Sequence, residues 1–338
     1  MREHKPNVRP QEEMASGNWF IHFVKRVRGR LEYTKKQISL ARLRHATISK
    51  REFISDLKRA IEGKVGYAAG KNGHSEQYWM YYEIVLNKAR DGSEVRLYEK
   101  DLEFPFLKNT GIFPMSPDFV LKYNRFYIEH VRNLDCLGIF IDHPRELEIL
   151  KYYELRNKLI HFVNQEPDRS RPDNPDNCYL QYFRDKKLLL VCPFAGLLKE
   201  RATKEIFEGV WSKTGKKWFY PKSVDALEFP YGFSPETHKK YKTAIDLFEH
   251  IASQIANRDF DVALIGAAGL AIPIASHIKS IGKVGIDLGG HLQILFGVIG
   301  ERWQNWESWK RDYFNDWWIN MPDKYKPNRR DVGDYDYW

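Results

Sequence analysis

Cysteine is scarce in this chain, and its spacing suggests neither a bridge nor a metal site. Cys136, Cys178 and Cys192 are odd in number, lie far apart and form no C-x-x-C pair. A disulfide framework and a zinc site are therefore not indicated. We expect three buried thiols.

Long apolar runs are also missing. No stretch approaches the roughly 20 residues that a membrane-spanning helix needs, and the amino end lacks the apolar core of a secretory signal. A chain of 338 residues suits two domains, or one large domain with an extension. We expect a cytoplasmic protein.

The dinucleotide-binding pattern G-x-G-x-x-G is absent as well, although a strand-helix-strand pattern is present. Residues 262–265 are typical of a buried strand, a turn follows at 266–269, and apolar residues recur at helical spacing up to Gly282. Residues 284–288 predict a second strand. Such a unit implies a parallel sheet, with a ligand cleft beyond the carboxyl ends of its strands.

Two glycine loops should line that cleft. One contains Gly266 and Gly269, and the other contains Gly289 and Gly290, followed by a short helix that includes Gln293. Glycines let the backbone approach a phosphate closely, but they also occur in ordinary tight turns. Both interpretations stay open.

Positive charge is concentrated near the amino end. Residues 19–51 contain ten Lys or Arg and one acid, Glu32, so this segment alone accounts for the net charge of +9. Apolar residues recur at helical spacing between these charges, which suits a helix on an anionic membrane surface and equally a basic helix packed on the protein. Nucleic-acid binding through this arm is less favoured, since no known nucleic-acid-binding module is recognisable.

The remaining pattern predicts a layered α/β fold with a mainly parallel sheet. We expect a basic, largely helical extension over residues 1–90 and a catalytic domain over residues 91–338, with a boundary at the turn signal Asp91-Gly92. Further helices are expected over 53–61, 75–90, 102–108, 117–133, 146–162, 197–209 and 235–256. Further strands are expected over 95–98, 135–141 and 187–191, and an exposed loop over 165–177.

Several short pieces resemble one glycosyltransferase family. These are DVALIGA, LGG-LQILFG and RW within residues 261–303, RLYEKD at 96–101, NTGIFP at 109–114, LLLVCPF at 188–194 and the tail 317–338. Taken in order, they are similar to the GT-D type glycosyltransferases over residues 94–338. The resemblance implies a Rossmann-like fold that uses a nucleotide-sugar donor, with a UDP-sugar expected first, to extend a surface or protein-linked glycan.

The resemblance also implies site residues. Glu99 and Asp101 match the family's acidic pair, with the two acids exchanged, and would hold Mn²⁺ or Mg²⁺; oxygen ligands suit both ions. In an extended strand, residues two apart point to the same side, which suits such a pair. Arg96, Asn109 and Gly111 match positions expected to contact the donor.

The glycine loop supplies the remaining candidates. Asp287 and His291 flank the diglycine and can provide the base that deprotonates an acceptor hydroxyl, and Asp101 completes the set of candidate catalytic residues. A structural role stays open, with Asp287 capping the next helix and His291 bonding a carbonyl. The altered acidic pair also leaves open a sugar-nucleotide-binding or scaffold protein without catalysis.

Overall fold

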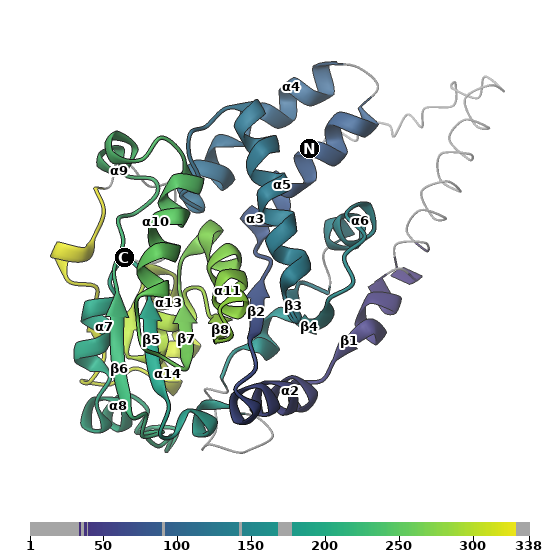
Figure 1. Ribbon diagram of the computed structural model, residues 1–338. Helices are drawn as coiled ribbons and strands as arrows, with labels where there is room; N and C mark the ends of the chain where they lie inside the picture. Colours follow the sequence, from purple (N-terminus) through teal and green to yellow (C-terminus); the bar gives the residue numbers. More distant parts are fainter. Residues whose placement is uncertain are drawn as a thin grey trace, which may run out of the picture. The chain divides into compact units, whose positions relative to one another are not determined.

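The computed structural model describes residues 34, 37, 38, 40–89, 92–141, 144–167 and 178–328. The chain separates into two compact units, Met1–His45 and Ala46–Trp338. The second unit contains an eight-stranded sheet in the order β1-β4-β3-β2-β8-β7-β5-β6, and every neighbouring pair runs parallel (Figure 1). The α/β class and the mainly parallel sheet predicted above are thus confirmed.

The strands are short, as parallel strands buried between helices often are. They are β1 Thr47–Ile48, β2 Tyr67–Lys71, β3 Cys136–Ile139, β4 Lys158–His161, β5 Lys187–Val191, β6 Ser223–Leu227, β7 Val262–Ile265 and β8 Val284–Asp287. A separate parallel pair consists of β9 Val298–Ile299 and β10 Ile319–Asn320.

Helices connect most of these strands. They are α2 Lys50–Gly63, α3 His74–Lys88, α4 Gly92–Lys100, α5 Pro117–Asn133, α6 Pro144–Tyr152, α7 Ala195–Arg201, α8 Lys204–Val210, α9 Pro235–Lys240, α10 Ala244–Ala256, α11 Ala271–Ser280, α12 His291–Leu295, α13 Glu301–Gln304 and α14 Glu307–Asp312. A π-helical segment, Phe104–Asn109, lies between α4 and α5.

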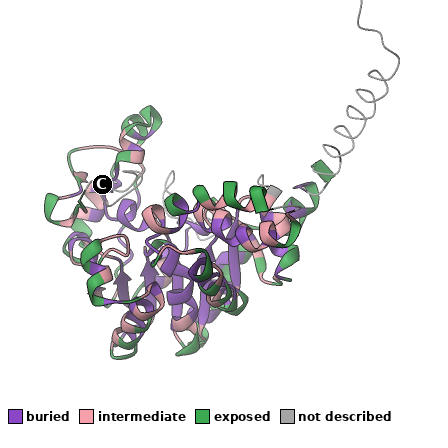
Figure 2. Cartoon of the chain, turned by 90° about the horizontal axis from the view of Figure 1, so that it is seen from above, coloured by how far each residue is buried: buried purple, intermediate pink, exposed green. Residues whose placement is uncertain are grey.

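The sheet separates two packed layers. On one face, α11 lies against β2, β7 and β8 and also contacts α5 and α10. Gly70 makes this close packing possible, because a Cβ there would lie 2.6 Å from Ile272 Cγ1. The other face is covered by a buried cluster that contains Phe53 and Leu57 of α2 as well as strand side chains such as Leu190. Figure 2 accordingly shows the strands buried and the outer helix faces exposed.

The strand order creates a switch point. From β2 the chain builds outward through β3 to β4, and β7 connects to β8 in the same direction, whereas β5 connects to β6 in the opposite direction. Connections therefore diverge between β7 and β5, and parallel sheets bind ligands beyond the carboxyl ends of strands at such a point.

Several expected elements are confirmed. The helix over 117–133 is α5, the strand over 187–191 is β5, and the unit at 262–288 is β7, α11 and β8. Each has a clear local pattern with recognisable ends; α5, for instance, begins with a Ser116 side chain that accepts a hydrogen bond from Phe119 N.

Other expectations were wrong. Residues 95–98 belong to helix α4 instead of a strand, and the helix expected over 146–162 ends at Tyr152 and is followed by β4. The helices expected over 197–209 and 235–256 are each divided in two, because Thr203 and Thr243 begin new helices as N-caps. The edge strand β6 was not expected at all.

The boundary expected at Asp91 does not match the sheet. Strand β2 lies between β3 and β8, so residues before 91 form the middle of the same sheet as residues after it. The compact unit begins at Ala46. Residues 67–71, within a glycine-rich segment, form strand β2, which packs closely under α11.

Several expectations fall wholly or largely outside the described residues. These are the lead-in 1–18, most of the basic arm 19–51, the loop residues 168–177 and the tail after Asn328. Membrane or nucleic-acid contact through the arm stays a prediction. Within the described ranges, no helix combines the length and apolar character needed to cross a membrane.

Candidate functional site

Two adjoining cavities open at the carboxyl edge of the sheet. One, here called the aromatic cavity, has a volume of about 770 Å³, and the other, the polar cavity, of about 820 Å³. Both lie around the loops that follow β7 and β8, where the sequence predicted a cleft. They share five lining residues: Asn109, Thr110, Ala268, Gly289 and Gly290.

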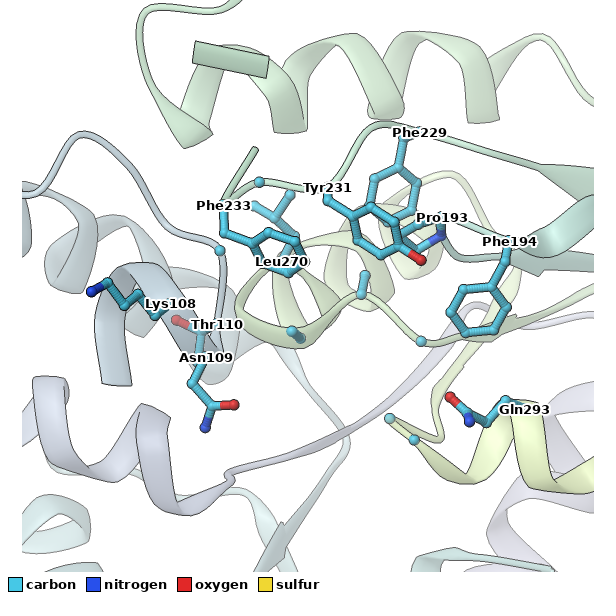
Figure 3. Close-up of a pocket in the computed structure, with 17 residues that line it drawn as sticks. Lys108, Asn109, Thr110, Pro193, Phe194, Phe229, Tyr231, Phe233, Leu270 and Gln293 are labelled. Atoms are coloured by element: carbon cyan, nitrogen blue, oxygen red, sulfur yellow. The ribbon is translucent and has the colours of Figure 1, made fainter. Parts of the chain in front are cut away.

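The aromatic cavity is formed by the loops after β5, β6, β7 and β8. Tyr231 and Phe233 stack with their ring centroids 5.1 Å apart, and Phe194 and Phe229 line the same space. In Figure 3 the rings of residues 229–233 gather on one side of the view, and Asn109 and Gln293 lie on the opposite side. The cavity thus combines aromatic walls with a few carboxamide groups.

The polar cavity lies over the ends of β2 and β8. Three rings stack in series along it, with centroid distances of 4.0 Å between His74 and Phe140 and 4.2 Å between Phe140 and Phe162. Its charged or titratable lining residues are Lys71, His74, Glu76, Asp287, His291 and Arg302. Both signs of charge therefore meet in one cavity.

Lys71 and His291 converge on one buried carboxylate. Glu166 Oε1 lies 3.1 Å from Lys71 Nζ and 2.6 Å from His291 Nδ1. Lys71 Nζ also donates a hydrogen bond of 2.8 Å to Leu288 O, and its side chain is only 4% exposed. A carboxylate that holds an imidazole by Nδ1 fixes its orientation, which is the arrangement of a general base with its orienting group.

Asp287 joins the two central strands. Its Oδ2 accepts a hydrogen bond of 3.1 Å from Lys71 N, and its Oδ1 accepts one of 2.8 Å from Gly289 N. Burial raises the pKa of Asp287 to about 6, although Lys71 and the backbone N–H groups act in the opposite direction. The side chain therefore fixes the diglycine loop against β2, which favours the structural role over that of a base.

The predicted glycines have different roles. Gly289 adopts φ +53° and Gly111 φ +70°, conformations that side chains rarely tolerate. Gly266 lines the aromatic cavity, and a Cβ there would lie 3.1 Å from Gly289 O. Gly269 lines neither cavity; a Cβ on it would meet Ile112 at 2.7 Å, so it serves packing.

Arg96, Glu99 and Asp101 lie away from both cavities. Because residues 92–100 are helical, side chains two apart do not share a face, and the geometry expected for the acidic pair is absent. Glu99 accepts a hydrogen bond from the Tyr82 hydroxyl, and Asp101 one of 3.5 Å from Tyr78. Arg96 Nε bonds to Gly92 O within its own helix.

The residues expected to hold a divalent cation therefore do not fit that task. Each carboxylate of the pair is bonded to a tyrosine of α3, and no group of three or more His, Cys, Asp or Glu among the described residues could hold a metal ion. The cations that line the polar cavity are side chains, Lys71 and Arg302.

Four important residues were missed: Lys71, Glu166, Tyr231 and Phe233. Lys71 ends a strand and precedes the turn Asn72-Gly73 and a helix, the same strand–glycine–helix pattern that was recognised at 262–271. That repetition was an available signal. Glu166 lay inside the loop over 165–177 that was expected to be exposed, an expectation that is wrong for Gln165 and Glu166, which are buried. Nothing in the local sequence distinguishes Glu166.

A scan against protein-family models, a search of curated proteins and a search of solved structures each found no match.

Proposed function

We propose that the protein is a glycosyltransferase that takes its sugar from a nucleotide-sugar donor, with a UDP-sugar as first choice. The acceptor is a hydroxyl group on a surface or protein-linked glycan. The observation that carries this proposal is the Lys71–Glu166–His291 cluster, whose Lys71 and His291 line the polar cavity beside the aromatic cavity.

His291 acts as the base. Glu166 holds Nδ1, so Nε2 takes the proton of the acceptor hydroxyl. The acceptor oxygen forms a bond to the anomeric carbon, and the bond from that carbon to the donor phosphate breaks. The leaving diphosphate keeps the electron pair.

The lysine offsets the charge of the leaving group. Lys71 directs two of its three N–H groups to Glu166 and Leu288 O, and its position in the lining lets the third point to a phosphate. A fixed, buried cation stabilises a developing negative charge more strongly than a cation in water does. No step here runs through Glu99 or Asp101.

The test compares binding with turnover in His291→Asn. Thermal shift with UDP-, GDP-, dTDP- and CMP-sugars, with and without Mn²⁺, identifies the donor through its stabilisation of the folded state. We expect His291→Asn to keep that stabilisation and to lose about 10²- to 10⁴-fold in transfer or donor hydrolysis. His250→Asn, on α10 and outside both cavities, is the matched control.

Two results would contradict the proposal. If none of the donors raises the melting temperature, a nucleotide sugar is not the ligand. Stabilisation without any transfer or hydrolysis by the wild type would instead favour a sugar-nucleotide-binding protein without catalysis.

A further inference from the structure

The lining of the aromatic cavity favours one chemical class of ligand over others. Its walls come from Phe194, Phe229, Tyr231 and Phe233, and from Leu270 on the side of α11. A sugar ring carries hydroxyl groups around its whole rim, and several would be left without partners in such a space, which is costly. A flat ring with apolar faces and a polar edge suits it better.

Carboxamide side chains in the cavity can form hydrogen bonds with the polar edge of such a ring. Asn109 and Gln293 line the same cavity, and each amide offers both donor and acceptor groups. The bases of nucleotides have this combination of flat faces and a hydrogen-bonding edge, and they stack readily on aromatic side chains.

The cavity is also connected to the charged site. Gly289 and Gly290 line both cavities, so a ligand can pass over the diglycine from one to the other. Lys71 Nζ would be 3.8 Å from a Cβ at Gly289, which places the buried cation directly beside this passage. A ligand with a flat ring at one end and phosphates at the other matches the two cavities in order.

The aromatic pair is held in place by its surroundings. The Tyr231 hydroxyl donates a hydrogen bond of 2.7 Å to Tyr325 O. Between the two rings, Gly232 packs so tightly that a Cβ there would lie 2.0 Å from Gly111 O. The turn carrying Tyr231 and Phe233 is therefore fixed against the loop at Gly111, as a preformed subsite requires.

We propose that the aromatic cavity is a nucleobase subsite, in which the base packs against Tyr231 and Phe233 while the phosphates cross Gly289 and Gly290 toward Lys71. This inference rests on the proposed function and assigns the donor its orientation. The transferred sugar then lies in the polar cavity, near His291.

The test separates the base from the phosphates. Affinities of UDP and inorganic pyrophosphate are measured by calorimetry for the wild type, Phe233→Ala, Lys71→Met and the control Phe104→Ala, a partly exposed ring outside both cavities. We expect Phe233→Ala to weaken UDP binding about tenfold or more and to leave pyrophosphate binding at the wild-type level. Lys71→Met should weaken both ligands.

Melting curves of all variants establish that each is folded, and Arg302→Met replaces Lys71→Met if the latter is not. If Phe233→Ala binds UDP within about twofold of the wild type, or if the wild type binds pyrophosphate as tightly as UDP, the base subsite is wrong and the proposed function stands. If the wild type binds no nucleoside diphosphate in a panel of UDP, GDP, dTDP and CDP, both proposals fail.

Discussion

Buried carboxyl groups set the chemistry of this molecule at the scale of single residues. Burial raises the pKa of Glu76 to about 7 and that of Glu146 to about 8. Glu146 is fully buried and accepts hydrogen bonds from Asn72 Nδ2, at 3.0 Å, and from Gln77 Nε2. Through these hydrogen bonds Glu146 holds the turn after β2 in place, close to Lys71.

The raised pKa values have a definite consequence for stability. A carboxyl group whose pKa is higher in the folded state binds more protons there than in the unfolded chain. For Glu146 this holds between its ordinary value of 4.5 and about 8, so its contribution to stability falls as the pH rises through that window.

Glu146→Gln should remove this part of the pH dependence. The amide stays neutral, and its N–H groups can reach Asn72 Oδ1 or Gln77 Oε1, buried acceptors with no hydrogen bond in the structure. Since one pKa unit corresponds to about 1.4 kcal/mol, we expect the variant to be more stable than the wild type at pH 8.5, relative to pH 5.5, by on the order of 1–3 kcal/mol. Urea unfolding at both pH values measures this difference.

The control is Glu62→Gln, which removes an exposed carboxyl group on α2. Equal pH slopes for the wild type and Glu146→Gln would show that the pKa of Glu146 is not raised in the folded state.

At the scale of elements, caps decide where helices begin. The sequence allowed one helix over 235–256, but the chain bends between α9 and α10, and Thr243 begins the second helix. Its side chain accepts a hydrogen bond of 3.2 Å from Asp246 N, and the Asp246 side chain accepts one of 2.8 Å from Thr243 N. The signal for this break was the capping-box pattern of Thr243 and Asp246, and not apolar periodicity, because residues 236–240 contain no apolar side chain.

Thr243→Ala tests this cap. Loss of the hydroxyl leaves Asp246 N without its partner, and we expect a loss of about 1 kcal/mol in the free energy of unfolding. Denaturant titration provides the measurement, and Ser253→Ala, an exposed hydroxyl within the same helix, is the control. A variant as stable as the control would mean that the Thr243 hydroxyl contributes nothing to stability.

At the scale of the whole molecule, the sheet joins segments that are distant in the chain. All residues that line the two cavities lie between Lys71 and Arg302, and the compact unit around them begins at Ala46. Removal of β2 would divide the sheet between β3 and β8, since β2 pairs with both.

Two truncations distinguish the possible boundaries. We expect residues 46–338 to unfold cooperatively and to keep donor binding, because the whole sheet and the cleft are retained. Residues 91–338 should fail to fold, because buried side chains such as Cys136 and Val284 lose the strand between them. Scanning calorimetry with and without the donor measures the unfolding transition of each fragment. A cooperative transition in the shorter fragment would restore the boundary at Asp91.

The sequence by itself determined what depends on local order. Apolar periodicity and turn residues were sufficient for α5, β5 and the unit from β7 to β8, and therefore for the parallel sheet and the loop at Gly289 and Gly290. Only the tertiary structure decided which side chains meet at that loop. Lys71 and Glu166 are 95 residues apart, and Lys71 and Asp287 are 216 apart. The order of the strands in the sheet brings such distant residues together. That order depends on how whole elements pack, and the spacing of residues along the chain does not predict it.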